Sequence, residues 1–170
     1  MVSKEINSRK VNASKVLVIY DSQTGSTEKM AQAVVKGVQQ VKGVEVELLK
    51  VGTPFSISKL AIADALILGS PTRYGNVTSE MRLLLESLTE LKESKKLKLS
   101  GKIGGVFGSY GWDGGWVVEK LKEDLIQLGI KIVAPAVSLV HEPYVGSQIN
   151  EETLTKCVEL GKTVAEKLAK

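Results

Sequence analysis

A cluster of hydroxyl side chains early in the chain is suited to holding a phosphate group. Four hydroxyls surround Gly25, and they belong to Ser22, Thr24, Ser26 and Thr27. The cluster follows an apolar, β-branched run at 15–20 and precedes an amphipathic stretch, so it lies between an expected strand and an expected helix. A helix start has unpartnered amides and the positive end of the helix dipole, and both attract anions. The alternative is an ordinary helix cap, because serine and threonine are common there.

The lack of charge in this loop narrows the kinds of phosphate it could hold. The loop as a whole consists of Ser22, Gln23, Thr24, Gly25, Ser26 and Thr27, and it contains no lysine or arginine. The lysine of a triphosphate-binding loop is therefore missing, as are the spaced glycines of a dinucleotide-binding loop. A phosphate would be held here by hydroxyls and backbone dipoles alone, which favours an enclosed monophosphate.

Strands and helices are expected to alternate along the chain. Apolar or alternating runs predict strands at 15–20, 44–49, 63–69 and 102–108, followed by a strand pair at 130–133 and 136–141. Helical periodicity predicts helices at 26–41, 56–63, 77–91, 115–128 and 151–169. This alternation is typical of an α/β domain with a parallel sheet, helices on both faces and right-handed crossovers.

Two further loops qualify as binding segments because of their position. Ligands of doubly wound sheets bind beyond the carboxyl ends of the strands, where the strand order reverses. The loops after the third and fourth expected strands, at 69–76 and 108–115, are both rich in glycine and present aromatic residues. Three loops of this kind at one edge of a sheet favour a phosphate-bearing ligand over a simple helix cap.

On these three loops the chain resembles the flavodoxin family, and the resemblance covers 15–170. It implies a flavodoxin-like, doubly wound, five-stranded parallel sheet of order 2-1-3-4-5 in the short-chain form, with FMN as cofactor. The loop at 22–27 resembles the phosphate-binding signature of the family. The two later loops correspond to its flavin-ring loops, which implies that the ring is bound by Pro71, Thr72, Arg73, Tyr74, Gly75, Asn76, Ser109, Tyr110, Gly111, Trp112, Asp113 and Gly114.

The flavin-ring loops carry residue types that suit a flat, largely apolar ring. Tyr74, Tyr110 and Trp112 offer planar faces for stacking, and backbone amides of the glycine-rich loops can meet the polar edge of the ring. Gly75 is a candidate for a peptide that reorients when the flavin gains a proton, since glycine accepts both backbone conformations.

Arg73 is the point at which the chain departs from the family, whose members are acidic around the flavin. Pointing inward, its charge would stabilise reduced flavin or hold an anionic substrate, and Asp113 could pair with it. Pointing outward, Arg73 would dock a partner. We expect the outward orientation, because arginine is rarely buried without a partner.

The resemblance implies an electron carrier in which no side chain acts as a catalytic acid or base. We expect it to shuttle single electrons between redox partner proteins, a donor reductase or ferredoxin and an acceptor, at a flavin edge that Tyr144 also borders. One alternative is an enzyme, an FMN-dependent NAD(P)H:quinone oxidoreductase, since 71–76 resembles such enzymes. Another is a stand-alone flavodoxin module serving a diiron or rubredoxin-like partner, since 108–112 resembles the flavodoxin domain of flavodiiron proteins.

Composition and charge fit one globular domain of ordinary makeup. The 170 residues are 43% hydrophobic and 25% charged, with a formal net charge of +4. Five lysines and one glutamate lie at 92–102 without interleaved aromatic residues. We therefore expect a solvated loop there, able to steer an acidic partner, rather than a nucleic-acid site.

The remaining features exclude several classes of site. A single cysteine, Cys157, and a single histidine, His141, leave no disulfide framework and no metal site. We expect Cys157 to be an inert buried thiol, His141 a surface residue and the polar segment 1–14 a flexible tail. No apolar run is long enough to span a membrane, so we expect a cytoplasmic monomer or small homo-oligomer without nucleic-acid or membrane partners.

Overall fold

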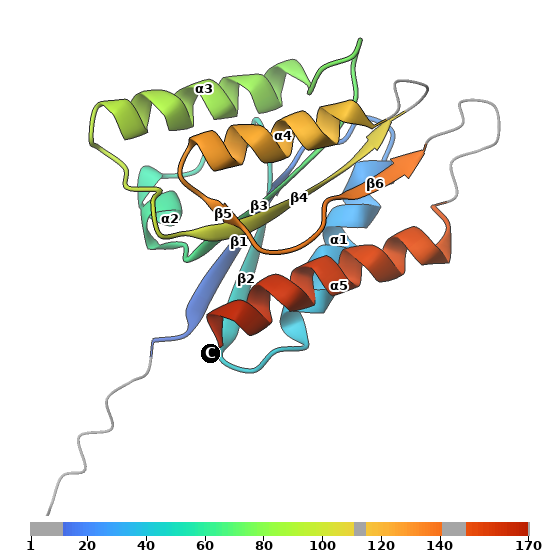
Figure 1. Ribbon diagram of the computed structural model, residues 1–170, viewed down its shortest axis with the longest axis horizontal. Helices are drawn as coiled ribbons and strands as arrows, with labels where there is room; N and C mark the ends of the chain where they lie inside the picture. The colour runs from blue at the N-terminus through green and yellow to red at the C-terminus, as the bar shows by residue number, and fades with distance from the viewer. Residues whose placement is uncertain (1–11, 111–114, 141–148, 170) are drawn as a thin grey trace, which may run out of the picture.

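The structure, a computed structural model, describes residues 12–110, 115–140 and 149–169 (Figure 1). Its strands are β1 Ser14–Tyr20, β2 Val44–Lys50, β3 Ala65–Pro71, β4 Ile103–Tyr110, β5 Lys131–Ile132 and β6 Val137–Val140. Its helices are α1 Ser26–Gln39, α2 Ile57–Ile62, α3 Ser79–Glu93, α4 Trp116–Gln127 and α5 Glu151–Leu168. Strands and helices alternate as predicted. Of the predicted tail at 1–14, the segment 1–11 lies outside the described residues.

The strands form one parallel sheet of order β2-β1-β3-β4-β5, which confirms the predicted order. β6 also pairs with β4 in parallel, so the predicted fifth strand consists of two pieces that share one edge of the sheet. Ile132 pairs with Gly104 and Val137 pairs with Phe107. From Ile132 to Val137 the chain advances by five residues, whereas β4 advances by only three, from Gly104 to Phe107. The two extra residues interrupt the pairing with β4 between β5 and β6.

The central strands continue further than predicted, which changes the place of three candidate residues. Pro71 of β3 pairs with Ser109 of β4, and Tyr110 pairs with β6. These three residues, predicted to lie in loops, are therefore the last residues of strands. We predicted shorter strands because their apolar runs end at Gly69 and Gly108. In the structure, a Cβ atom on Gly108 would overlap the carbonyl oxygen of Ser70. This glycine allows the two strands to approach, so the ladder continues through it.

Helices cover both faces of the sheet, as predicted (Figure 1). Alternate side chains of β1 point to opposite faces. Val16 and Val18 join the core that α1 and α5 cover, whereas Leu17 and Ile19 join the core beneath α2, α3 and α4. The sheet is buried on both faces, which the continuous apolar runs of its central strands indicate. Across the described residues, every helix is too short or too polar to span a bilayer.

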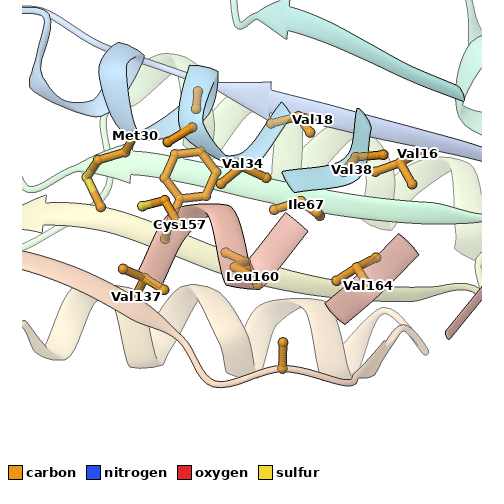
Figure 2. Packing of buried hydrophobic residues seen from close by; sticks show 14 of the residues in the cluster. Val16, Val18, Met30, Val34, Val38, Ile67, Val137, Cys157, Leu160 and Val164 are labelled. Carbon is orange, nitrogen blue, oxygen red and sulfur yellow. The ribbon is translucent and has the colours of Figure 1, made fainter. Parts of the chain in front are cut away.

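α1 and α5 approach each other through two glycines. A Cβ atom on Gly37 of α1 would overlap the carbonyl oxygen of Val158, and one on Gly161 of α5 would overlap the carbonyl oxygen of Val34. Val34 and Leu160 belong to the apolar cluster around this contact (Figure 2). The position of α1, and with it the loop that precedes α1, is therefore fixed by α5 as well as by the sheet.

The lysine-rich segment at 92–102 is only in part the solvated loop that we predicted. Lys95, Lys96 and Lys98 are exposed. Lys102 is buried, and its Nζ donates to the carbonyl oxygens of Ala61 and Ala63, at the end of α2. Burial lowers the pKa of Lys102. Lys102 therefore ties α2 to the start of β4 instead of extending into solvent.

Replacing Gly161 with alanine tests the contact between α1 and α5. We expect Gly161→Ala to lower the free energy of unfolding by about 1–3 kcal/mol, because the added methyl group forces the helices apart. Thr155→Ala, at an exposed position of the same helix, is the matched control, with an expected change within about 0.5 kcal/mol. Urea unfolding followed by circular dichroism measures both. Wild-type stability of Gly161→Ala would contradict the close contact.

The thiol of Cys157 offers a second test of this core. Cys157 is buried on α5 as predicted (Figure 2), and burial raises its pKa from 9.0 to about 12. The buried neutral thiol therefore contributes fully to the free energy of unfolding below pH 9. This contribution is lost as the pH rises towards 12, because the unfolded chain ionises first.

We expect the folded protein to resist thiol reagents at about pH 8 and to react fully once denatured. In the wild type, the free energy of unfolding should fall between pH 9 and 12, and Cys157→Ala should remove part of that fall. Reaction of the folded protein as fast as the denatured chain would contradict the burial of this thiol.

Candidate functional site

The loop between β1 and α1 is shaped by hydrogen bonds among its own residues. The amide of Ser22 donates to Asp21 Oδ1 at 2.8 Å, and Ser22 Oγ accepts the amide of Gly25 at 3.1 Å. Gly25 has a φ of 95°, a left-handed conformation that glycine adopts without strain. It occupies the cap position of α1, which begins at Ser26. The predicted alternative, a serine or threonine that caps the helix, is therefore wrong.

The amino end of α1 is an open cradle for an anion. No described side chain caps it, so the first amides of the helix, those of Ser26, Thr27 and Glu28, lack helical partners. The Oγ atom of Ser26 is buried and has no hydrogen-bond partner among the described residues. Buried hydroxyls nearly always have a partner, and free helix amides favour an anion. This set of donors fits a phosphate group.

Thr27 and Ser109 bring the three predicted loops together. Thr27 Oγ1 lies 3.0 Å from Ser109 Oγ, and both residues are buried. The carbonyl oxygen of Ser109 accepts the amide of Thr72 at 2.8 Å. Residues from the first, second and third loops therefore meet at Ser109. The hydroxyl of Thr27 is engaged in this contact, so it acts as a link between loops.

The loop after β3 contains a tight turn. Arg73 and Asn76 exchange two backbone hydrogen bonds, of 2.7 and 3.0 Å. Tyr74 and Gly75 lie between them with φ values of 50° and 74°. Two consecutive positive φ values define a type I′ turn, in which glycine is favoured and tyrosine is strained. Gly75 thus already adopts a conformation that only glycine accepts readily.

The side chains of this turn reach solvent. Tyr74 is fully exposed, with a relative exposure of 102%, and Arg73 is exposed as well. Asp113, with which Arg73 could pair, lies outside the described residues, as do Gly111, Trp112 and Gly114. His141 and Tyr144 also lie outside them.

A pocket of about 140 Å³ lies where the three loops converge. Its walls consist of candidate residues, namely Gln23, Thr24, Pro71, Thr72, Arg73, Ser109 and Tyr110. Thr72 Oγ1 is buried and has no hydrogen-bond partner among the described residues. The ring of Tyr110 packs against Gly115 at the start of α4, where a Cβ atom would lie 2.8 Å from Tyr110 Cε1. The structure therefore gathers candidates from all three loops around one pocket, although Ser26 and Thr27 of the first loop are not in its lining.

A larger groove of about 660 Å³ runs between α3 and α4, and it is a poorer candidate for an anion. Asn76 is the one predicted site residue among its described lining residues, which include the carboxylates of Glu86, Glu90, Glu93 and Asp124. These carboxylates repel a phosphate, although Arg82, Lys92 and Lys120 also line the groove. The smaller pocket is therefore the better candidate for binding an anion.

Two residues beside the site were missed by the sequence analysis. Trp116 begins α4 and is half exposed, and Lys120 Nζ lies 5.6 Å from the centroid of its ring. Lys120 Nζ also donates to Asn76 Oδ1 at 3.4 Å, which ties α4 to the Arg73–Asn76 turn. The four-residue spacing of tryptophan and lysine in an expected helix was a usable signal. The contact between Lys120 and Asn76 joins segments that lie far apart in the sequence, so no local sequence signal could have predicted it.

Residues 18–161 match the family model described as Flavodoxin. The chain belongs to the flavodoxin family. The matched span contains all three candidate loops, including 111–114, which lie outside the described residues. The family resemblance on which the sequence analysis relied is thereby confirmed.

Relatives of this flavodoxin-family chain are mostly longer proteins. An uncharacterised protein of Methanocaldococcus jannaschii is 36% identical over 155 residues, which are 89% of this chain and 36% of that protein. A nitric oxide reductase of Moorella thermoacetica is 32% identical over 162 residues, 91% of this chain and 36% of that protein. An NAD(P)H dehydrogenase (quinone) of Geotalea daltonii is 37% identical over 118 residues, 56% of this chain and 57% of that protein. The chain thus spans 36% to 57% of their lengths.

Solved structures show the same fold in short and long chains. A flavodoxin from the domain Archaea has a TM-score of 0.76 at 29% identity, and the match covers 92% of this chain and 99% of that one. Rubredoxin oxygen:oxidoreductase of Desulfovibrio gigas has a TM-score of 0.77 at 28% identity, over 91% of this chain and 36% of that one. The fold of this flavodoxin-family protein therefore occurs both as a nearly whole chain and as about a third of a longer one.

The unpartnered hydroxyl of Thr72 leads to a prediction for the protein without ligand. Thr72→Val is expected to leave the free energy of unfolding unchanged or slightly raised, because it removes a buried hydroxyl that makes no hydrogen bond. Thr27→Val is the matched control. It breaks the Thr27–Ser109 bond and leaves the hydroxyl of Ser109 unpaired, which costs about 1–3 kcal/mol. Urea unfolding of ligand-free protein measures both, and equal losses would show that Thr72 has a protein partner.

Proposed function

We propose that this protein binds FMN at the three loops and carries single electrons between redox partner proteins. The proposal is carried by the uncapped amino end of α1, where the buried Ser26 Oγ has no partner among the described residues. In the pocket at the loops, the buried Thr72 Oγ1 likewise has no partner among the described residues. Helix amides and hydroxyls are donors that suit a phosphate monoester. Flavin bound there would supply one- and two-electron redox chemistry.

Each loop has a part in this proposal. The segment Ser22, Gln23, Thr24, Gly25, Ser26 and Thr27 would hold the phosphate. The rest of the cofactor would be held by Pro71, Thr72, Arg73, Tyr74, Gly75, Asn76, Ser109, Tyr110, Gly111, Trp112, Asp113 and Gly114. Of the three proposed stacking residues, Tyr110 lines the pocket, whereas the fully exposed Tyr74 would have to turn towards it.

The absence of a cation in the phosphate loop bears on the redox potential. Segment 22–27 contains no lysine or arginine, so its neutral donors would leave the charge of the phosphate uncompensated. An uncompensated negative charge disfavours further negative charge nearby. The potential for reducing the bound flavin to its anionic, fully reduced form would therefore be low. A low potential suits a protein that passes electrons to an acceptor of low potential.

The rim of the pocket offers exposed side chains at which redox partner proteins could dock. Arg73 and Tyr74 reach solvent at the rim. A donor reductase or ferredoxin and an acceptor could therefore dock at the rim.

Two specific observations favour second candidates. The likeness to the quinone dehydrogenase of Geotalea daltonii supports an FMN-dependent NAD(P)H:quinone oxidoreductase, whose reaction is a two-electron hydride transfer. The likeness to about a third of rubredoxin oxygen:oxidoreductase supports a flavodoxin module that serves a diiron or rubredoxin-like partner. Reduction by pyridine nucleotide alone separates the first of these from a carrier.

FMN binding by the purified protein is the first experiment. We expect the protein to retain FMN through desalting, and we expect Ser26→Ala and Thr72→Val each to weaken binding by about tenfold, the effect of one lost hydrogen bond of about 1.4 kcal/mol. Ser87→Ala, at an exposed position of α3, is the control and should bind as wild type does. Failure of the wild type to retain flavin would overturn the proposal.

Anaerobic mixing with NADH or NADPH then separates carrier from enzyme. A carrier keeps its visible flavin spectrum until a reductase or a chemical reductant is added. Immediate bleaching by the nucleotide alone would contradict the carrier and support the quinone oxidoreductase.

A further inference from the structure

A carboxylate lies in the first turn of the helix that forms the phosphate cradle. Glu28 is the third residue of α1, two positions after Ser26. A glutamate at this position commonly turns back towards the amides that begin the helix, where the helix dipole also attracts it. In that orientation the Glu28 carboxylate would lie beside the donors that a phosphate needs and would repel its charge.

The structure holds this carboxylate elsewhere. The hydroxyl of Tyr20 donates to Glu28 Oε1 at 2.9 Å. Tyr20 is the last residue of β1 and is only 6% exposed, and its ring belongs to the core under α1. Burial of the hydroxyl raises the pKa of Tyr20 to about 12, and the hydrogen bond to Glu28 and its charge add to this effect. At neutral pH Tyr20 is therefore a fixed donor that points at Glu28.

The second carboxylate beside the loop is also engaged. Asp21 directly precedes the loop 22–27, and its Oδ1 accepts the amide of Ser22 at 2.8 Å. Asp21 and Glu28 thus bracket a loop without any cation, and each is bound to a donor outside the open amino end of α1. Asp21 is held by the backbone itself, so Tyr20 is the side chain on which the arrangement depends.

We propose that Tyr20 is a positioning residue that keeps the Glu28 carboxylate out of the cradle and thereby sets a preference for flavin that carries a phosphate. This inference rests on the proposed function, since the anion concerned is the phosphate of FMN. Riboflavin has the same ring without the phosphate, so it provides a probe that this mechanism does not affect.

The test compares FMN with riboflavin as ligands of Tyr20→Phe. Removing the hydroxyl releases Glu28, so the dissociation constant for FMN is expected to rise by about tenfold, whereas that for riboflavin stays within about twofold of wild type. Quenching of flavin fluorescence during titration measures both. Equal weakening of FMN and riboflavin would mean that Tyr20→Phe only loosens the core, which would overturn the proposal.

Removal of the released charge should restore FMN binding. We expect the double variant Tyr20→Phe, Glu28→Gln to bind FMN within about threefold of wild type, because the neutral amide no longer repels the phosphate. Glu80→Gln in the same Tyr20→Phe background is the matched control, since Glu80 lies in the first turn of α3 and should restore nothing. Equal rescue by both variants would reduce the effect to net charge and would contradict a role for Glu28 in particular.

The hydrogen bond itself has an independent readout. Glu28→Gln is expected to lower the pKa of Tyr20 from about 12, because a neutral partner stabilises the protonated hydroxyl less. Near-ultraviolet absorbance during alkaline titration measures the ionisation of the tyrosines. The part of the absorbance change that is missing in Tyr20→Phe belongs to Tyr20. An unchanged titration, in a wild-type protein that binds FMN, would overturn this inference alone. Absence of FMN binding by the wild type would instead overturn the proposed function.

Discussion

The parallel ladder that joins β1, β3 and β4 is the interaction on which the whole site depends. Tyr20 pairs with Gly69, and Gly69 pairs with Phe107, so the three strands end at one edge of the sheet. Loops that lie far apart in sequence leave this edge side by side. The hydrogen bonds that link these loops, above all those at Ser109, form only because the ladder brings the loop backbones together.

The alternation of elements and the position of the three loops could be predicted, because apolar periodicity and glycine-rich strand ends are local features. The strand order was predicted only from the family resemblance, since local sequence does not say which strands are neighbours. The ends of β3 and β4 could not. Pro71 and Ser109 are held in the sheet by pairing with each other, and such pairing depends on a neighbouring strand that local sequence does not describe. The split of the edge strand into β5 and β6 has the same origin.

In the candidate site, sequence alone identified the hydroxyl cluster but not the part of each hydroxyl. Ser22 shapes the turn, Thr27 bonds to Ser109, and Ser26 keeps a buried hydroxyl without a partner in the described residues. These parts follow from where each side chain points once α1 is packed. The bond between Tyr20 and Glu28 was missed because neither residue is unusual by itself, and their meeting requires the crossing of α1 over β1.

The glycine contact between α1 and α5 also sets an order of events during synthesis. α1 ends at Gln39 and α5 ends at Leu168, so a ribosome adding about 5–20 residues per second completes α5 about 6–26 seconds after α1. Until then α1 lacks the surface that Gly37 and Gly161 bring to it. The nascent chain therefore completes the helix of the candidate site early but fixes its position last, so this site takes its final shape only in the finished domain.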